Sequence, residues 1–265
     1  MKVKVLCTAC INENAALPIS EKRDIIPWVT IPLQESKIYS FKCEKGHSCK
    51  VIVSGLKHEV LFESGVLALK DGYFREAVTS FAASLERFYE FIILVLLMKE
   101  AKSNKIGFDK VWKSVVNQSE RQLGAVNFLF FKEFGKAMPT LDDLKISKND
   151  LGGKTPVEFR NGIIHKGLIP TSASAINYGQ AVTDHIVQII TEVATTREDL
   201  LLDALRYIQA NDFAELGEEQ PHFMTNAFFL STLSIFHSFD MTDLVTARTQ
   251  RLTDYIVRVN NNGMR

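Results

Sequence analysis

The spacing of hydrophobic and polar positions changes near residue 55. Before that point, residues 2–6, 38–41 and 50–53 form short apolar runs of the kind found in strands. After it, apolar residues recur at three- and four-residue steps, as on one face of an amphipathic helix. The clearest stripe consists of Phe74, Val78, Phe81, Leu85, Phe88, Ile92 and Val95. The pattern predicts a mainly α chain that begins with a small β module.

Turn residues and breaks in this pattern divide the chain into three parts. We predict a β module over residues 1–54, a helical domain over 55–196, and a C-terminal helical extension over 197–265 packed on the bundle. Prolines in the segment 11–32 argue against a central strand there. Besides the short helix treated below, the expected helices cover residues 56–70, 73–102, 108–116, 120–136, 173–195, 197–209, 224–239 and 243–257.

Composition narrows the classes of function. The 265 residues include 31 lysines and arginines and 31 aspartates and glutamates, so non-specific binding of duplex DNA is not indicated. The most apolar run, residues 91–98, is far shorter than the roughly 20 residues that span a bilayer. No signal-peptide pattern precedes the first cysteine pair. These features predict a cytoplasmic protein with no membrane partner.

All four cysteines lie before residue 50, in a pattern typical of metal ligands. Cys7 and Cys10 form one knuckle, and the segment from Cys43 to Cys49 supplies a second with His47 inside it. Two such knuckles beside strands predict a zinc ribbon with Cys7, Cys10, Cys43 and His47 as ligands. Cys49 in place of His47 is the main alternative, while two disulfides are disfavoured in a cytosolic chain. Because four side chains would fill the shell, we expect structural zinc and no catalytic metal.

A short helix with both ends marked carries an arginine and a histidine. Thr155 to Glu158 form a capping box with proline at the first helical position, and Gly167 ends the helix. Arg160 and His165 lie between these signals, and the pair suggests phosphodiester chemistry, since arginine grips phosphate and histidine moves protons near neutral pH. Spacing alone favours the alternative of a histidine that caps carbonyls and an arginine in a surface ion pair, since any chain has many arginine and histidine pairs.

Geometry refines the arrangement of these side chains. Five residues along a helix correspond to about 140° of rotation, so Arg160 and His165 do not share a face, whereas Asn161 and His165 do. On the longest predicted helix, Glu86 and Glu90 lie at i and i+4, where like charges repel. A basic partner from elsewhere would relieve one of them, and Arg160 is a candidate. The alternative is two solvated glutamates with Arg87 or a lysine nearby.

Two segments resemble the HEPN superfamily. They are residues 72–90, which include Ser-Leu-Glu-Arg, and residues 159–170, where Arg160 and Asn161 precede His165, Lys166 and Gly167. The resemblance covers roughly residues 56–195 and implies a helical bundle that forms a homodimer with a composite active site. Many members are metal-independent endoribonucleases of phage defence or toxin systems.

When the functional residues of the family are carried over by position, the resemblance implies that Arg160 and His165 are the catalytic pair. Asn161 would orient them, and Glu86 would support Arg160. One branch of the family carries a tyrosine two residues after the histidine as a target of nucleotidylation. This chain has Gly167 there, so that form of regulation is not expected.

The resemblance leads to a concrete expectation of RNA cleavage. A ribose 2′-hydroxyl would attack the adjacent phosphorus and leave a 2′,3′-cyclic phosphate. The neutral net charge favours a structured RNA or a single-stranded loop as the partner. The alternative is a non-catalytic HEPN module that binds RNA or nucleotide, or that senses a phage protein as trigger through its ribbon. A third interpretation, a transcription-associated adaptor, rests on the zinc ribbon alone.

Overall fold

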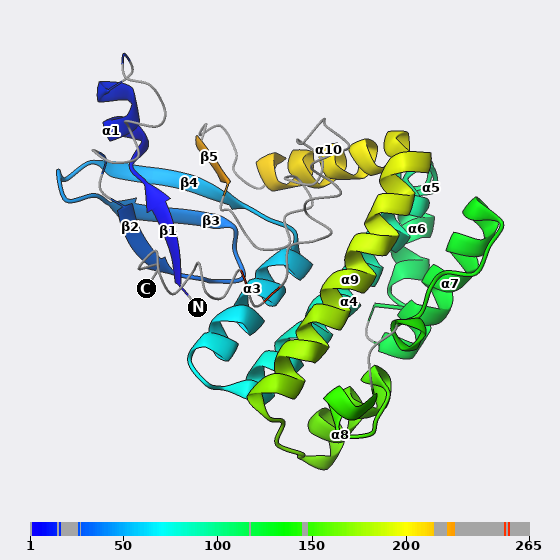
Figure 1. Ribbon diagram of the computed structural model, residues 1–265. Helices are drawn as coiled ribbons and strands as arrows, with labels where there is room; N and C mark the ends of the chain where they lie inside the picture. The colour runs from blue at the N-terminus through cyan, green and yellow to red at the C-terminus, as the bar shows by residue number, and fades with distance from the viewer. Residues whose placement is uncertain are drawn as a thin grey trace. The chain divides into compact units, whose positions relative to one another are not determined.

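The computed structural model describes residues 2–14, 16, 26, 28–116, 118–144, 148–214, 222–225, 252 and 254. It divides into two compact units (Figure 1). The N-terminal unit comprises Met1–Gly55 and Tyr207–Ala227, and the helical unit comprises Leu56–Arg206 and Phe228–Arg265. The prediction of a mainly α chain with a small β module is confirmed. The three-part division stays a prediction, because most of residues 197–265 lies outside the described residues.

The N-terminal unit contains two small sheets. Strand β1 (Lys2–Leu6) pairs antiparallel with β2 (Trp28–Pro32), and the helix α1 (Thr8–Glu13) follows β1 directly. In the other sheet, β3 (Ile38–Lys42) pairs antiparallel with β4 (Ser48–Ser54). The three strands expected from the alternation are therefore present, and their inward residues form one buried cluster with the cysteines.

Two strands were not expected. β2 lies in the proline-containing segment, and among the described residues it pairs with β1 alone, so Pro32 occupies a sheet edge where a missing N–H costs little. β5 (His222–Thr225) pairs parallel with β4. The predicted helix over residues 224–239 is therefore wrong at its first two residues, because a tertiary pairing with β4 outweighs the local pattern. Its remainder lies outside the described residues, as does the predicted helix over 243–257 apart from residues 252 and 254.

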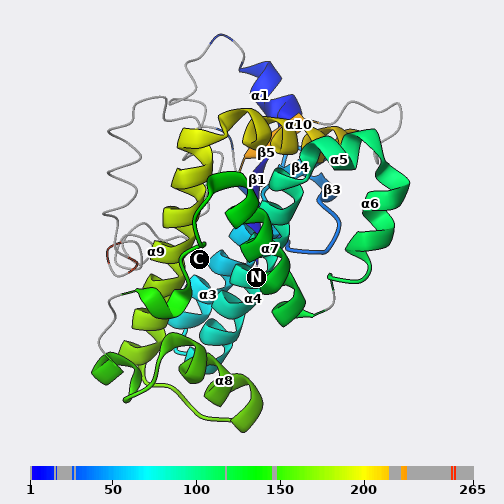
Figure 2. The same ribbon diagram turned by 90° about the vertical axis from the view of Figure 1, so that its right-hand side faces the viewer.

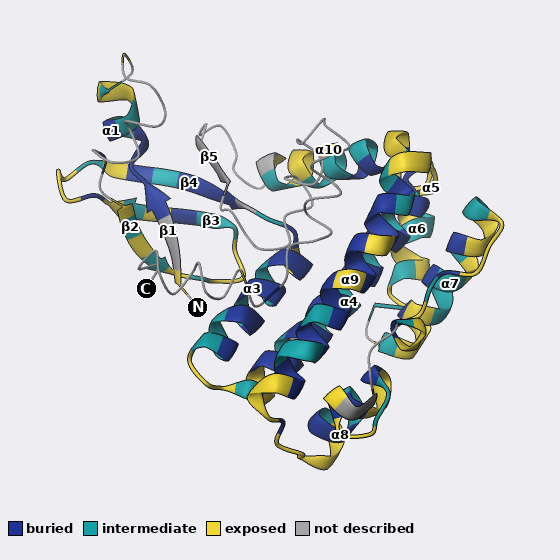
Figure 3. Cartoon of the chain, in the orientation of Figure 1, coloured by how far each residue is buried: buried dark blue, intermediate teal, exposed yellow. Residues whose placement is uncertain are grey.

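The helical unit is organised around one long helix, α4 (Phe74–Leu96). α3 (Lys57–Lys70), α7 (Ser119–Phe134), α8 (Pro156–Lys166) and α9 (Ser172–Thr196) all pack against it. Buried residues are concentrated where α3, α4 and α9 meet (Figure 3). The other elements of this part of the chain are α5 (Met98–Ser103), α6 (Lys105–Trp112), η1 (Leu141–Asp143), η2 (Lys148–Leu151) and α10 (Glu198–Ala214), whose residues from Tyr207 onward belong to the N-terminal unit.

The helix predicted over residues 73–102 is two helices. Leu97 ends α4 and precedes α5 with φ −107° and ψ 19°, outside the helical range. No glycine or proline stands there, so the pattern of apolar positions gives no sign of the break. Among the described residues, no helix combines the length and the apolar character needed to cross a membrane.

Two glycines allow α3 and α9 to approach α4 closely at Phe81. A Cβ atom at Gly65 of α3 would lie 2.5 Å from the Phe81 ring, and one at Gly179 of α9 would lie 2.7 Å from it. The ring therefore fills the space that a side chain would occupy on either neighbouring helix. This packing holds α3 and α9 against α4, the helix that carries Glu86 and contacts α8.

The same core encloses two histidines. His58 of α3 and His185 of α9 are both buried, and the Tyr89 hydroxyl lies 2.9 Å from His185 Nε2. Burial lowers the pKa of His58 to about 3 and the pKa of His185 to about 4, the latter against the attraction of the Asp143 carboxylate. Both rings are therefore neutral in the folded protein at neutral pH.

We expect the helical unit to lose stability as the pH falls from about 6.5 to about 4. An unfolded histidine takes up a proton near pH ~6.5, whereas the folded rings resist protonation down to their lowered pKa values. The unfolded state therefore binds more protons in this window, and the free energy of unfolding should fall by up to about 1.4 kcal/mol per pH unit and histidine. Above about pH 7 this contribution should be constant.

Amide hydrogen exchange of α4 and α9, corrected for its intrinsic pH dependence, measures how the free energy of unfolding changes with pH. The useful range is about pH 7 to pH 5, above the pH at which most carboxylates titrate. His165→Gln removes an exposed imidazole and serves as the matched control with an unchanged slope. Exchange free energies that do not vary with pH would contradict the prediction.

Candidate functional site

Helix α8 is anchored at both ends by local hydrogen bonds. The Glu158 N–H donates to Thr155 Oγ1 at 3.3 Å, and the Thr155 N–H donates to Glu158 Oε2 at 3.0 Å, which confirms the predicted capping box. At the other end, Gly167 adopts φ 68°, and the N–H of Leu168 donates to the Gly162 carbonyl at 3.1 Å. The residues that flank Arg160 and His165 in the sequence thus set both ends of the helix that carries them.

A contact from outside the helix also supports its start. Asp142 Oδ1 of η1 accepts a hydrogen bond from the N–H of Val157 at 3.2 Å. A carboxylate at a helix N-terminus satisfies a backbone donor that has no partner within the helix. Figures 1 and 2 show α8 at the end of the bundle where α9 begins.

Arg160 is held in place by two neighbours. Its Nη2 forms an ion pair with Glu86 of α4, and its Nη1 donates to Asn161 Oδ1 at 3.0 Å. The side chains of Arg160 and Glu86 are 22% and 27% exposed, so the pair is partly shielded and still open to solvent. The contact between Glu86 and Arg160 suggested by the like-charge pattern is therefore present. The described residues leave the other guanidinium N–H groups without a partner.

Glu90, the other member of the like-charge pair, has separate partners. Arg87 Nη1 lies 2.6 Å from Glu90 Oε1, and Gln122 Nε2 donates to the same oxygen at 2.8 Å. Burial raises the pKa of Glu90 despite the opposing effect of Arg87. Each of the two glutamates therefore has its own basic partner, and of the two it is Glu86 that contacts α8.

Tyr178 of α9 packs against Phe159 of α8, the residue before Arg160. Its ring centroid is 5.8 Å from that of Phe159, and the side chain is buried. Burial raises the pKa of its phenol, and the Arg160 guanidinium acts in the opposite direction. Tyr178 therefore keeps its proton and lies near enough to Arg160 for the guanidinium charge to act on it. The sequence offered no role for it.

His165 is not joined to the other predicted site residues. It lies in the last turn of α8 with its side chain exposed, and it makes no hydrogen bond or ion pair with any residue that the structure describes. The rotation of about 140° between positions five residues apart separates His165 from Arg160, whereas Asn161 shares the face of His165 without a hydrogen bond to it. The structure thus links Glu86, Arg160 and Asn161 by polar contacts within one chain and leaves His165 outside these contacts. The catalytic roles of all four stay predictions.

The predicted metal ligands converge in the N-terminal unit. Ligand atoms of Cys7, Cys10, Cys43 and His47 all lie within 4.8 Å of one another. Cys7 caps α1 and accepts a hydrogen bond from the Cys10 N–H at 3.4 Å. Between β3 and β4, Gly46 adopts φ 84° and donates to the Cys43 carbonyl at 2.9 Å, which closes the second knuckle.

Distances within this cluster fit a tetrahedral zinc ion. Zinc with sulfur at about 2.3 Å and nitrogen at about 2.0 Å requires S···S separations of about 3.8 Å and S···N separations of about 3.5 Å. The Cys10 and Cys43 sulfurs are 4.0 Å apart, and His47 Nδ1 lies 3.4 Å from Cys10 Sγ and 3.7 Å from Cys7 Sγ. The cluster can therefore hold a metal ion such as zinc.

Cys49, the alternative fourth ligand, is placed differently. Its sulfur is 3.1 Å from Cys7 Sγ, shorter than two thiolates on one zinc ion allow, and it lies outside the group that shares the 4.8 Å limit. All four cysteines are free thiols. Burial raises the pKa of Cys7 to about 12 and also raises that of Cys10, so a cation beside them is needed to favour the thiolates.

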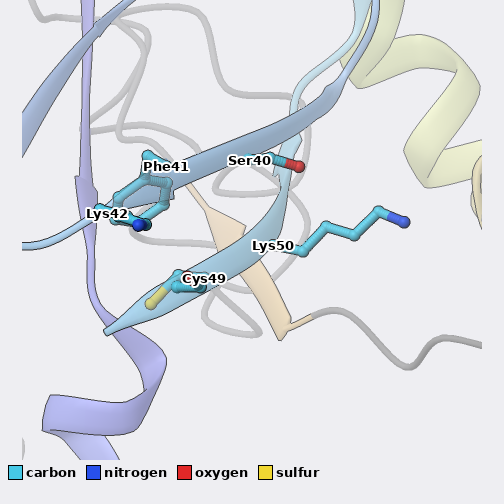
Figure 4. A pocket seen from close by; sticks show the side chains of 6 residues that line it. Ser40, Phe41, Lys42, Cys49 and Lys50 are labelled. Atoms are coloured by element: carbon cyan, nitrogen blue, oxygen red, sulfur yellow. The ribbon is translucent and has the colours of Figure 1, made fainter. Parts of the chain in front are cut away.

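A shallow hollow of about 430 Å³ lies on the β3–β4 hairpin. Its lining residues are Ser40, Phe41, Lys42, Ser48, Cys49 and Lys50. Ser40 and Lys50 are paired across the strands and point to the same side, away from Cys49 (Figure 4). The hollow contains none of the predicted site residues.

Comparisons with known proteins complete the description of these sites. Searches of protein-family models, curated proteins and solved structures found no match to this chain.

Proposed function

We propose that the helical unit is a HEPN-type endoribonuclease domain that cleaves RNA without a catalytic metal, as a phage-defence or toxin effector. The observation that carries this proposal is the arginine held by Glu86 and Asn161 on the same short helix as an exposed histidine. A fixed guanidinium with open N–H groups is suited to a phosphate, and an imidazole open to solvent is available to a substrate.

The chemistry assigned to these residues is a transesterification. The 2′-oxygen of a ribose bonds to the adjacent phosphorus, and its proton passes to a neutral His165 acting as general base. The bond from phosphorus to the 5′-oxygen breaks, and a protonated histidine supplies the proton that the leaving oxygen needs. Arg160 stabilises the negative charge on the non-bridging oxygens, and Glu86 and Asn161 keep the guanidinium oriented.

We further propose that the active cleft forms between two copies of the chain. In one chain, His165 makes no hydrogen bond with Arg160, and in a dimer the two His165 side chains would divide the base and acid roles. Large apolar side chains next to the motif support a protein partner on this face, since exposed apolar patches mark interfaces. They are Val157 at 42%, Leu168 at 42% and Ile169 at 81% exposure.

The metal in the N-terminal unit is proposed to be structural zinc. Cys7, Cys10, Cys43 and His47 would complete a tetrahedral shell, which leaves no position for substrate. Free cysteines fit a reducing compartment, and we propose the cytoplasm as the location. With balanced charge, the RNA partner is proposed to be a structured RNA or a single-stranded loop, with a phage protein as possible trigger.

Purified protein incubated with cellular RNA in EDTA tests the proposed reaction. We expect fragments with 2′,3′-cyclic phosphate and 5′-hydroxyl ends, because the nucleophile belongs to the substrate. An oligonucleotide with deoxyribose at the cleaved position should stay intact. Cleavage that requires added metal, or that yields 5′-phosphate ends, would rule out this mechanism.

A non-catalytic module that binds RNA or nucleotide is the second candidate. The separation of His165 from Arg160 within one chain favours it. Such a module would bind RNA without turnover, and binding would depend on Arg160 and not on His165. A filter-binding assay with Arg160→Ala and His165→Ala, run beside the cleavage assay, separates the two functions.

A further inference from the structure

The two ring nitrogens of His47 face different chemical groups. Nδ1 points to the sulfurs of Cys7 and Cys10, at 3.7 Å and 3.4 Å, while Nε2 lies 3.2 Å from Glu13 Oε1. A neutral imidazole has one N–H donor and one acceptor nitrogen, and a carboxylate only accepts. The proton therefore belongs on Nε2, and the lone pair of Nδ1 faces the cysteine cluster.

Glu13 is well placed to fix this orientation. It is the last residue of α1, the helix that begins at the Cys7 cap and contains Cys10. Asn14 Nδ2 donates to the Cys10 carbonyl at 2.8 Å and so secures the end of this helix. Lys45, in the turn that carries His47, places its Nζ 3.4 Å from Glu13 Oε2. One carboxylate thus links the helix of the first knuckle to the turn of the second.

We infer that Glu13 is a positioning residue for the metal centre, which orients His47 so that Nδ1 is the ligand atom. This inference rests on the metal site of the proposed function. Carboxylates that accept a hydrogen bond from a ligating histidine fix its tautomer and ring orientation and raise its basicity. Without Glu13, the His47 ring loses the partner of its Nε2 and is free to rotate away from the cysteine sulfurs.

Zinc affinity of the full-length chain, measured by competition with a chromogenic chelator, tests this role. Glu13→Ala should weaken zinc binding about 10- to 100-fold. Glu13→Gln keeps an oxygen that can accept from Nε2 and should recover part of the affinity. Glu44→Ala is the matched control. Glu44 lies in the turn that carries His47, and its exposed carboxylate makes no hydrogen bond or ion pair with the described residues.

The imidazole nitrogens of His47 give a second, structural readout. Long-range ¹H–¹⁵N correlation spectra of the zinc-loaded protein should show the proton on Nε2 and the metal on Nδ1. Zinc affinities that are equal for Glu13→Ala and Glu44→Ala, or a proton on Nδ1, would overturn the role of Glu13 alone. A wild-type chain that binds no zinc would overturn the metal site and this inference together, without bearing on RNA cleavage.

Discussion

Replacing His165 with alanine is expected to lower the rate of RNA cleavage by about 10²- to 10⁴-fold, the usual contribution of a general acid or base. The side chain is exposed and makes no hydrogen bond or ion pair with the described residues, so its removal takes away no polar contact within the chain. The loss should therefore appear in the chemical step, with the free energy of unfolding unchanged. Single-turnover cleavage rates and thermal unfolding, measured on the same preparation, separate the two effects.

Lys166→Ala is the control for the histidine variant. Lys166 is exposed in the same last turn of α8, and the substitution removes a charge from that turn without touching the proposed chemistry. Its cleavage rate should stay within a few-fold of the wild type. Equal cleavage by wild type and His165→Ala would mean that the histidine is not part of the site.

Arg160→Lys tests the arginine of the proposed catalytic pair. Lysine keeps the positive charge opposite Glu86 but lacks the planar fork that contacts Glu86 and Asn161 together and that is proposed to hold the phosphate. A loss of about 10²- to 10³-fold in rate is expected from the weaker stabilisation of the transition state. Arg160→Ala is a poorer probe, because it also leaves the half-buried Glu86 carboxylate without its partner.

Removing the metal should have the second large effect, and it should be confined to one unit. Structural zinc in small domains contributes folding free energy directly, on the order of 10 kcal/mol in isolated fingers. A strong zinc chelator is therefore expected to abolish the hydrogen-exchange protection of β3 and β4. The amides of α4 and α9 should keep their protection, because these helices belong to a separate compact unit.

Two cysteine variants test which thiols hold the proposed metal. Cys43→Ser removes a proposed ligand and should reproduce the effect of the chelator. Cys49→Ser changes an equally buried thiol that lies outside the four-ligand group, and it should retain stoichiometric zinc, measured by elemental analysis. Zinc retained by Cys43→Ser and lost by Cys49→Ser would contradict the ligand assignment.

Some features of this protein depend on residues close together in the chain, and the sequence alone determined them. The limits of α8 follow from the Thr155–Glu158 capping box and from Gly167, all within one helical turn of the ends they define. The spacing within each knuckle, Cys7 to Cys10 and Cys43 to His47, is local as well, and it predicted the ligands of a cluster that the structure contains. Caps, knuckles and strand alternation are local, so a pattern can reveal them without knowledge of the rest of the fold.

Other features depend on segments far apart in the chain, and only the tertiary structure decided them. Like charges on α4 suggested Arg160 as a partner for a glutamate, but packing of α8 on α4 selected Glu86, 74 positions away, rather than Glu90. The pairing of β5 with β4 and the contact of Glu13 with His47 left no local signal either. Such contacts form because the closure of long loops is offset by burial over the whole unit, which no short stretch of sequence records.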